Sequence, residues 1–303
     1  MGYFRLTIPY YHTYAYLSMF VTSVIILDMS SLQIGIVGLP NVGKSTLFNA
    51  LTKNDILAAN YPFATIEPNT GIVPVPDLRL QKLSELYNNA PIVPATVTFL
   101  DIAGLVAGAS KGEGLGNKFL ANIRESDAIL HIVRAFENND IVHVNEQVNP
   151  KDDIDIINTE LILADLQTIE KTLPRFAKEA KANPKVKPTV ELLAQIQSIL
   201  ETGNLAPLTS LVHGLDPGSE SGVTLRSLQL ITTKPVIYVF NIDEENLVNT
   251  QKQQELAKLV SPARSVDQTG GPAQALFVNA QLEAELKDMN DEEALEMLES
   301  YGQ

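Results

Sequence analysis

The sequence of 303 residues contains no cysteine, which excludes disulfide scaffolds, thiolate metal sites and cysteine nucleophiles. Basic residues are also scarce, since 22 lysines and arginines stand against 36 aspartates and glutamates and give a formal net charge of −14. This balance argues against a uniformly basic nucleic-acid clamp, but it leaves room for a local basic patch. The lack of cysteine agrees with a reducing compartment, and we expect a cytoplasmic protein.

What is present is typical of a globular protein. Hydrophobic residues make up 45% of the chain and charged residues 19%, which excludes wholesale disorder and collagen-like chains. At roughly 150 residues per domain, the length indicates about two domains, or one large domain with an insertion.

The first thirty residues differ from the rest. Between Leu6 and Leu27, His12 is the only side chain able to carry charge near neutral pH, and about 20 apolar residues can span a bilayer. However, the first half of this stretch is rich in Tyr and Thr, and almost no linker separates it from the apolar run that begins at Leu32. Met29 offers an alternative start. We therefore interpret residues 1–30 as a non-native or mis-called extension, with a membrane or partner-binding segment as the alternative.

After this extension, short apolar runs alternate with helical stretches. The runs are mostly rich in β-branched residues and bounded by Gly, Pro, Asn or Asp, which is typical of strands. The predicted strands are Leu32–Val37, Gly71–Val75, Thr96–Leu100, Ala128–Val133, Val236–Phe240 and Ala275–Val278. Thr46–Asn54 is predicted to be a helix. Strands separated by helices indicate an α/β fold with a mostly parallel sheet and helices on both faces.

The pattern changes between Asp153 and Thr202. Apolar residues there recur near helical spacing in two runs, which Asn183, Pro184 and Pro188 separate. This pattern predicts an α-helical hairpin inserted into the α/β domain.

The segment Gly38–Ser45 reads GLPNVGKS and fits G-x-x-x-x-G-K-[ST] at every fixed position. Gly38 and Gly43 let the backbone wrap so that successive N–H groups point at phosphate oxygens, and the N-terminus of the following helix reinforces this. Lys44 is expected to reach the β- and γ-phosphates, and the Ser45 hydroxyl is expected to bind Mg²⁺. A chance glycine-rich turn is the alternative, which the position between a strand and a helix disfavours.

This loop identifies the α/β fold as that of a P-loop NTPase. We expect its domain to comprise residues 31–148 and 223–303, with the helical insertion at residues 149–222. The residues expected to contact the nucleotide in the loop are Asn41, Val42, Gly43, Lys44, Ser45 and Thr46.

A second motif expected to bind phosphate and metal lies at the end of the predicted third strand. Asp101 ends that strand and Gly104 completes a D-x-x-G segment, so Asp101 is placed to hold Mg²⁺ and the Gly104 N–H to contact the γ-phosphate. Thr65 lies in the irregular stretch between the two signals and is expected to complete the Mg²⁺ shell, with an ordinary loop hydroxyl as the alternative. The predicted metal ligands are thus Ser45, Thr65 and Asp101, and the predicted catalytic groups are Lys44, Thr65 and Gly104.

Base recognition departs from the pattern Asn-Lys-x-Asp that selects guanine. After the strand Val236–Phe240 the chain has Asn241, Ile242 and Glu244 at the positions of Asn, Lys and the final Asp. Because Glu is one methylene longer than Asp, its two-point contact with guanine would be misplaced, so guanine preference should be weak and adenine acceptable. The backbone N–H of Ala280, after the next strand, is a further candidate for the base edge, with a strand-end turn as the alternative.

The hydrolytic apparatus also departs from a common pattern. Many P-loop NTPases place Gln directly after the D-x-x-G glycine to orient the attacking water, whereas this chain has Leu105. We therefore expect slow intrinsic hydrolysis. His131 lies within an apolar run and is interpreted as a structural residue. Asn41 is a candidate for binding an activating K⁺, with a turn residue as the equal alternative.

These segments together resemble the YchF / Obg-like ATPase family of P-loop NTPases, over about residues 32–302. The resemblance rests on Gly38–Thr46, Asn60–Asn69, Asp101–Gly116, Asp140–Val144 and Asn241–Glu244. It implies hydrolysis of ATP in preference to GTP, a coiled-coil-like helical insertion, and binding to the ribosome or its large subunit. Family members carry a C-terminal TGS domain, which we expect to be absent because the chain stops at Gln303, and this leaves open any ribosome or RNA contact of that domain.

One basic cluster stands out on this acidic chain. It lies in the predicted hairpin and comprises Lys171, Arg175, Lys178, Lys181, Lys185 and Lys187. On a helix, several of these side chains share one face through i+3 and i+4 steps. The cluster is a candidate docking site for rRNA phosphates, and a solvated helix face is the equal alternative.

Three functions stay open at this point. The first is an ATP-driven switch that acts in translation. The second is a GTP-dependent nucleic-acid-binding or ribosome-assembly factor of Obg type. The third is a fragment that folds and binds nucleotide without the partner activity. No membrane partner is expected unless residues 1–30 are native.

Overall fold

The computed structural model describes residues 32–52, 70–101, 115–138, 148–260, 275–287 and 289–301. The predicted extension 1–30 and the site candidates Thr65, Gly104 and Leu105 lie outside the described residues. Within the described residues, no helix combines the length and apolar character needed to cross a membrane.

Six strands of the described chain form one sheet, in the order β2-β3-β1-β4-β5-β6. They are β1 (Leu32–Val37), β2 (Thr70–Pro74), β3 (Thr96–Asp101), β4 (Ala128–Ala135), β5 (Val236–Ile242) and β6 (Ala275–Val278). Neighbouring strands are parallel except for β2, which pairs antiparallel with β3. The predicted mostly parallel sheet is therefore confirmed. Strand β3 ends at Asp101, as expected, whereas β4 and β5 run two residues further than predicted, so that Asn241 belongs to β5.

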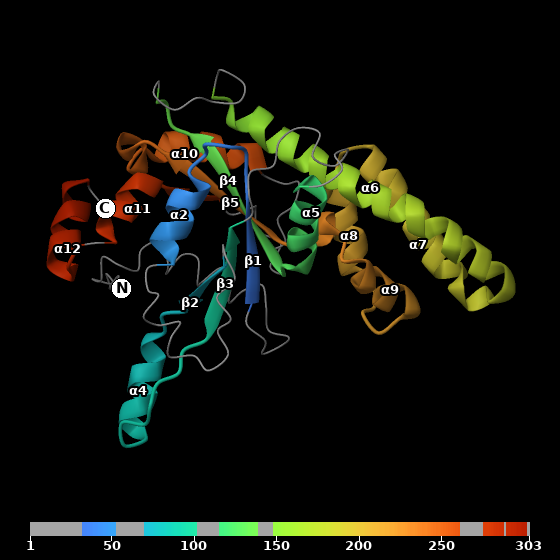
Figure 1. Ribbon diagram of the computed structural model, residues 1–303, viewed down its shortest axis with the longest axis horizontal. Helices are drawn as coiled ribbons and strands as arrows, with labels where there is room; N and C mark the ends of the chain where they lie inside the picture. The colour runs from blue at the N-terminus through green and yellow to red at the C-terminus, as the bar shows by residue number, and fades with distance from the viewer. Residues whose placement is uncertain are drawn as a thin grey trace.

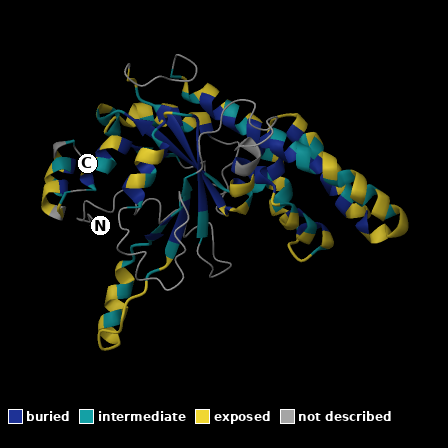
Figure 2. Ribbon diagram, viewed as in Figure 1, coloured by how far each residue is buried: buried dark blue, intermediate teal, exposed yellow. Residues whose placement is uncertain are grey.

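Helices cover both faces of this sheet, as predicted. Figure 1 shows α2 and α11 on one side and α5 and α6 on the other. The helices outside the insertion are α2 (Lys44–Leu51), α4 (Leu78–Leu86), α5 (Leu115–Glu125), α10 (Thr250–Val260), α11 (Ala280–Leu286) and α12 (Asp291–Ser300). The strands are the most deeply buried part of the molecule, as Figure 2 shows, and Ile34, Ile36 and Ile129 are fully buried in the core. Burial on both faces explains why these strands are continuous apolar runs.

The predicted helical hairpin is present and extends away from the sheet (Figure 1). Its helices are α6 (Pro150–Ala182) and α7 (Lys187–Glu201), joined by the short 3-10 helix η3 (Pro184–Val186), and α8 (Ala206–His213) and α9 (Glu220–Leu228) follow. Pro188 was expected to lie in the break, but it lies in the first turn of α7, where a missing backbone N–H costs no helical hydrogen bond. The hairpin has its own apolar cluster, which includes Ile169, Leu192 and Ile196.

The division into domains stays a prediction. The expected boundary between residues 222 and 223 falls inside α9 (Glu220–Leu228), so one helix continues across it.

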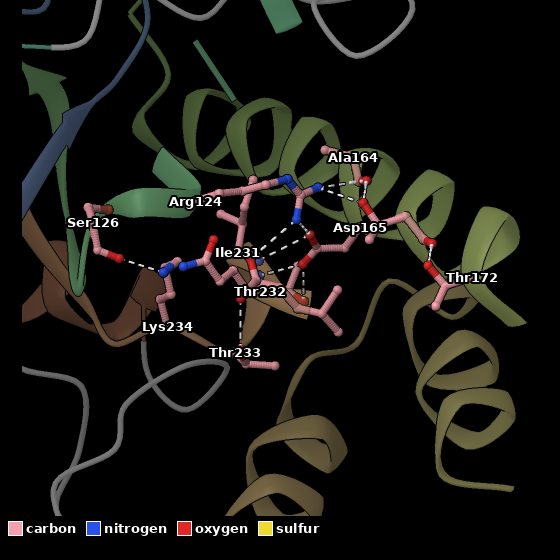
Figure 3. Close-up of polar contacts among 12 residues, drawn as sticks. Arg124, Ser126, Ala164, Asp165, Thr172, Ile231, Thr232, Thr233 and Lys234 are labelled. Atoms are coloured by element: carbon pink, nitrogen blue, oxygen red, sulfur yellow. Dashed lines mark hydrogen bonds and ion pairs between the residues drawn. The ribbon is translucent and has the colours of Figure 1, made fainter. Parts of the chain in front are cut away.

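An ion pair between a buried aspartate and a partly exposed arginine joins the hairpin to the sheet domain (Figure 3). Asp165 of α6 is 0% exposed, and its Oδ1 lies 3.1 Å from a guanidinium nitrogen of Arg124 at the end of α5. The same carboxylate accepts hydrogen bonds from the backbone N–H of Ile231 and from both the N–H and the hydroxyl of Thr232, at 2.7–3.1 Å. Ile231 and Thr232 belong to η4 (Ile231–Thr233), which leads into β5. Asp165 therefore joins three segments that are far apart in the sequence.

Candidate nucleotide-binding site

The predicted phosphate loop connects β1 to α2 and wraps tightly against neighbouring strands. A Cβ atom added to Gly38 would lie 2.5 Å from the backbone oxygen of Ile132 in β4, so no larger residue fits there without a shift. Asn41, also in the loop, has a positive φ of 62° and an exposed side chain. The loop thus has the geometry that a phosphate-binding turn requires, since its backbone runs against the sheet and opens at the N-terminus of α2.

Gly43 ends this loop in the left-handed conformation, with φ 95°. A Cβ atom added there would lie 2.4 Å from Nδ2 of Asn241, which is at the end of β5. Nδ2 of Asn241 donates a 3.0 Å hydrogen bond to the carbonyl of Val42. Glycine is therefore required at position 43 both by its backbone conformation and by the close approach of Asn241.

Gly43→Ala should weaken nucleotide binding by at least about tenfold, because the new methyl group must displace Asn241 from the loop. Gly203→Ala is the matched control, since Gly203 also has a positive φ, of 73°, but has no atom within 4 Å of the added Cβ. That control should lose roughly 1 kcal/mol of stability and no nucleotide affinity. Calorimetric titration of both variants tests this, and equal affinity in the native and Gly43→Ala proteins would contradict the role of the loop.

Lys44 is buried at the start of α2, with 7% of its surface exposed. Its Nζ donates a 2.6 Å hydrogen bond to the carbonyl of Leu39 in the same loop. Burial lowers the pKa of Lys44 from 10.5 to about 8, and the negative charge of Asp101 opposes this shift only in part. The ammonium group is thus held within the loop where the phosphates are expected.

The lowered pKa predicts a pH-dependent affinity. Because the charged form attracts phosphate, affinity for a triphosphate should fall as the pH rises from 7 to 9 through the Lys44 pKa, by at most tenfold per pH unit. In the ligand-free protein, by contrast, Lys44 should make the free energy of unfolding rise as the pH increases from about 8 to 10.5. The reason is that the unfolded chain binds more protons than the folded chain in this range. Lys44→Met should flatten both dependences. If the affinity of Lys44→Met depended on pH in the same way as that of the native protein, the assignment to Lys44 would be contradicted.

The predicted metal ligands Ser45 and Asp101 lie together. The Ser45 hydroxyl donates a 3.1 Å hydrogen bond to Oδ2 of Asp101, and Oδ1 of Asp101 is buried without a hydrogen-bond partner in the described part of the chain. A buried carboxylate oxygen with no donor fits Mg²⁺, which prefers hard oxygen ligands. The described residues contain no group of three or more His, Asp or Glu side chains suited to a metal ion, and the third predicted ligand, Thr65, lies outside them.

On the base side, Asn241 is the central residue. Besides its bond to Val42, its Oδ1 accepts a 3.0 Å hydrogen bond from the backbone N–H of Ala280. Asn241 thus occupies the Ala280 N–H in this structure, and use of that N–H for the base edge stays a prediction. The side chain of Ile242 is 1% exposed and packs in the core beneath α10, so it presents no side-chain surface to a base.

The sequence analysis missed a second asparagine contact. Nδ2 of Asn279 donates a 3.0 Å hydrogen bond to the carbonyl of Ile242, while its Oδ1 accepts from the N–H of Leu282 and caps α11. Asn279 and Asn241 together join β5 to the start of α11. Asparagine is a common helix cap, but no pattern in the sequence indicated its contact with β5.

Two other predicted residues have clear positions. His131 is 2% exposed in β4, and its ring centroid lies 5.2 Å from that of Tyr238, which agrees with a structural role. Glu244 begins the 3-10 helix η5 (Glu244–Leu247) and is partly exposed. The six members of the basic cluster are all exposed near the end of the hairpin where α6 meets α7.

Comparison with known proteins finds relatives over most of the chain. A family model described as 50S ribosome-binding GTPase matches residues 33–172. The chain is 47% identical over 269 residues to the ribosome-binding ATPase YchF of Pasteurella multocida, which covers 88% of this chain and 70% of that protein. It is 45% identical over 273 residues to the protein of the same name in Bacillus subtilis, which covers 90% and 72%.

A solved structure is similar as well. The YchF GTPase of Schizosaccharomyces pombe superposes with a TM-score of 0.70 at 35% sequence identity, over 91% of this chain and 73% of that protein. On the identity and coverage of these relatives, the chain belongs to the YchF family.

Proposed function

We propose that the chain is a nucleoside triphosphatase of the cytoplasm that prefers ATP to GTP and binds the large ribosomal subunit. The observation that carries the proposal is the phosphate loop, in which buried Lys44 and the Ser45–Asp101 pair lie at the N-terminus of α2. The names of the bacterial relatives support both the ATPase activity and the ribosome as partner. The Asn241–Glu244 variant of the base motif supports relaxed guanine specificity.

The residues have separate roles in this proposal. Backbone N–H groups of the loop bind the phosphates, and the Lys44 ammonium stabilises the negative charge that they carry during hydrolysis. Mg²⁺, held by Ser45 and Asp101, would supply further charge neutralisation when bound. Thr65 and Gly104 stay predictions for the metal shell and the γ-phosphate. Hydrolysis is expected to be slow because Leu105 can neither donate nor accept a hydrogen bond to a water molecule.

Calorimetric titration of ATP and GTP, with and without ribosomes, tests the function. Tighter binding of ATP than of GTP, together with an affinity for ribosomes that depends on the nucleotide, is the expected result. Failure of both nucleotides to bind would overturn the proposal.

The second candidate function is a GTP-dependent factor of Obg type. The name of the Schizosaccharomyces pombe relative and the description of the family model favour it, and Glu244 keeps a carboxylate in the base motif. Tighter binding of GTP than of ATP in the same titration would support this function instead.

K⁺ is proposed as an additional cofactor at Asn41, whose exposed side chain and positive φ place it at the turn of the phosphate loop. Hydrolysis faster in K⁺ than in Na⁺ is the expected outcome, and equal rates would remove K⁺ from the proposal.

The basic cluster is proposed to bind rRNA phosphates. Changing Arg175, Lys178 and Lys181 together to Glu should lower ribosome binding at least about tenfold at moderate salt, and should reduce its salt dependence by up to about one unit of slope per lost contact. Co-sedimentation at several salt concentrations measures both quantities.

The matched control changes three exposed lysines outside the hairpin, Lys82, Lys252 and Lys258, to Glu. It alters the net charge by the same amount, so it should retain most of the binding if the cluster is a local site. Equal losses in the two triple variants would assign the effect to overall charge and refute docking through the cluster.

A further inference from the structure

The helix α4 and the segment after it form an arm that projects from the sheet (Figure 1). The arm follows β2, the strand at one edge of the sheet, and leads back into β3. We call residues 77–95 the α4 arm. None of the residues of α4 is buried, and Figure 2 shows this helix as exposed or intermediate along its whole length. The arm therefore presents its side chains to the surroundings of the molecule.

Hydrogen bonds within the α4 arm fix its shape. The carboxylate of Asp77 caps the helix, since it accepts a 2.9 Å hydrogen bond from the backbone N–H of Arg79. At the other end, the Ser84 hydroxyl donates a 2.6 Å hydrogen bond to the carbonyl of Ala90. The backbone N–H of Asn89 donates to the carbonyl of Ser84 at 2.8 Å. The helix is thus held against the returning segment, and the surface of the arm is formed before any partner binds.

The α4 arm carries most of the exposed apolar surface that the structure describes. Six of the nine large apolar side chains exposed in the described part of the chain belong to it. They are Leu78, Leu83, Leu86, Tyr87, Ile92 and Val93. Scattered exposed apolar residues are normal on a protein, whereas a group of them on one small element marks an interaction surface.

The charge of the arm indicates what kind of partner fits. Its charged residues are Asp77, Arg79, Lys82 and Glu85, whose charges cancel, although the whole chain has a net charge of −14. Two copies of so acidic a chain repel each other. With nine residues, α4 is roughly 13 Å long, which exceeds the Debye length of about 8 Å at physiological salt. A contact from arm to arm therefore joins neutral surfaces and keeps the acidic bodies apart.

The outward face of α4 is also complementary to itself. Leu78, Lys82 and Leu86 share this face through i+4 steps, and Glu85 lies one turn after Lys82. In an antiparallel crossing about a two-fold axis, the first half of one helix faces the second half of the other. Lys82 then lies toward Glu85 of the second copy, and Leu78 lies toward Leu86 of the second copy. Each contact occurs twice.

We propose that the α4 arm is a self-association surface, and that its occupant is the α4 arm of a second copy of this chain, packed antiparallel about a two-fold axis. This inference goes beyond the proposed function, since it needs neither nucleotide nor ribosome. The arm is shorter than the about 20–30 residues that each side of a standard interface provides, so the dimer should be weak and reversible, with a micromolar dissociation constant.

Sedimentation equilibrium of the full chain over a range of micromolar concentrations tests the dimer. Leu83→Glu/Leu86→Glu should raise its dissociation constant at least about tenfold, because charges replace apolar side chains at the contact. Val223→Glu/Leu259→Glu is the matched control, since it adds the same two charges at exposed apolar positions outside the arm, and it should change the constant less than about twofold. A native protein that stays monomeric, or equal losses in the two double variants, overturns the inference.

The antiparallel arrangement has its own test. Lys82→Glu should weaken the dimer at least about threefold, because it places like charges together at both ends of the crossing. Lys82→Glu/Glu85→Lys restores opposite charges and the native net charge, so its dissociation constant should return to within about twofold of the native value. A double variant as weak as Lys82→Glu would refute this pairing.

The absence of cysteine allows a direct test of proximity. Under mild oxidation, Leu83→Cys should form an intermolecular disulfide at least about tenfold faster than Val223→Cys, because the dimer raises the local concentration of the first thiol. Equal rates would exclude the arm as the contact. If the native chain is monomeric and Leu83→Glu/Leu86→Glu lowers ribosome co-sedimentation, the arm binds the ribosome and the inference is overturned.

Discussion

Lys44→Ala should reduce hydrolysis of nucleoside triphosphate by at least about a hundredfold, which is the largest functional effect that we expect from one substitution. Its Nζ lies within the phosphate loop, 2.6 Å from the carbonyl of Leu39, and a positive charge there has no substitute among the neighbouring loop residues. With a pKa of about 8, most of the side chain is charged at pH 7. Single-turnover hydrolysis measures the loss.

The control for this substitution is Lys252→Ala, which removes an exposed lysine from α10 and should leave hydrolysis unchanged. Lys44→Ala should not destabilise the fold, because burial disfavours the charged amine in the ligand-free protein. Hydrolysis in Lys44→Ala within about threefold of the native rate would show that the loop is not the catalytic site.

The largest effect on stability is expected from Asp165→Ala. The substitution leaves the Arg124 guanidinium without its ion pair and leaves the buried N–H groups of Ile231 and Thr232 without an acceptor. Each buried donor left without an acceptor costs about 1–3 kcal/mol, so we expect a loss of about 3–5 kcal/mol in total, which corresponds to a fall in melting temperature of roughly 10 °C for a chain of this size. Thermal and denaturant unfolding measure the change.

Glu170→Ala is the matched control for Asp165→Ala. It removes the same charge from the same helix at an exposed position, so its free energy of unfolding should stay within about 0.5 kcal/mol of the native value. A loss in Asp165→Ala no larger than in Glu170→Ala would mean that the joint between the hairpin and the sheet domain does not depend on this carboxylate.

Local patterns in the sequence were sufficient for much of the architecture. The strands, the hairpin of α6 and α7 and the phosphate loop all follow from apolar periodicity or from glycine at fixed spacing, and these signals lie within a few residues of each other. The helix after the loop begins at Lys44, two residues before the predicted start at Thr46, because the left-handed turn at Gly43 already ends the loop. Asp101 was predicted at a strand end because a polar residue closes an apolar run there.

Contacts between residues far apart in the sequence could not be predicted from such local patterns. Asn241 was predicted as a base contact, but its bond to Val42 joins residues 199 positions apart and draws the phosphate loop to β5. The same holds for Asp165, whose carboxylate accepts hydrogen bonds from residues 66 and 67 positions away. An isolated buried polar residue produces no periodic pattern in the sequence, so its distant partner cannot be predicted from the sequence.

The sequence by itself therefore determined the α/β class, the order of the strands along the chain, the phosphate loop and the family resemblance, since each depends on residues that are neighbours in the chain. Only the tertiary structure decided that Ile242 faces the core, that the Ala280 N–H binds Asn241 and that Asn279 binds the Ile242 carbonyl. The physical reason is that parallel strands bring their carboxyl ends to one edge of the sheet, where side chains from separate segments compete for the same partners.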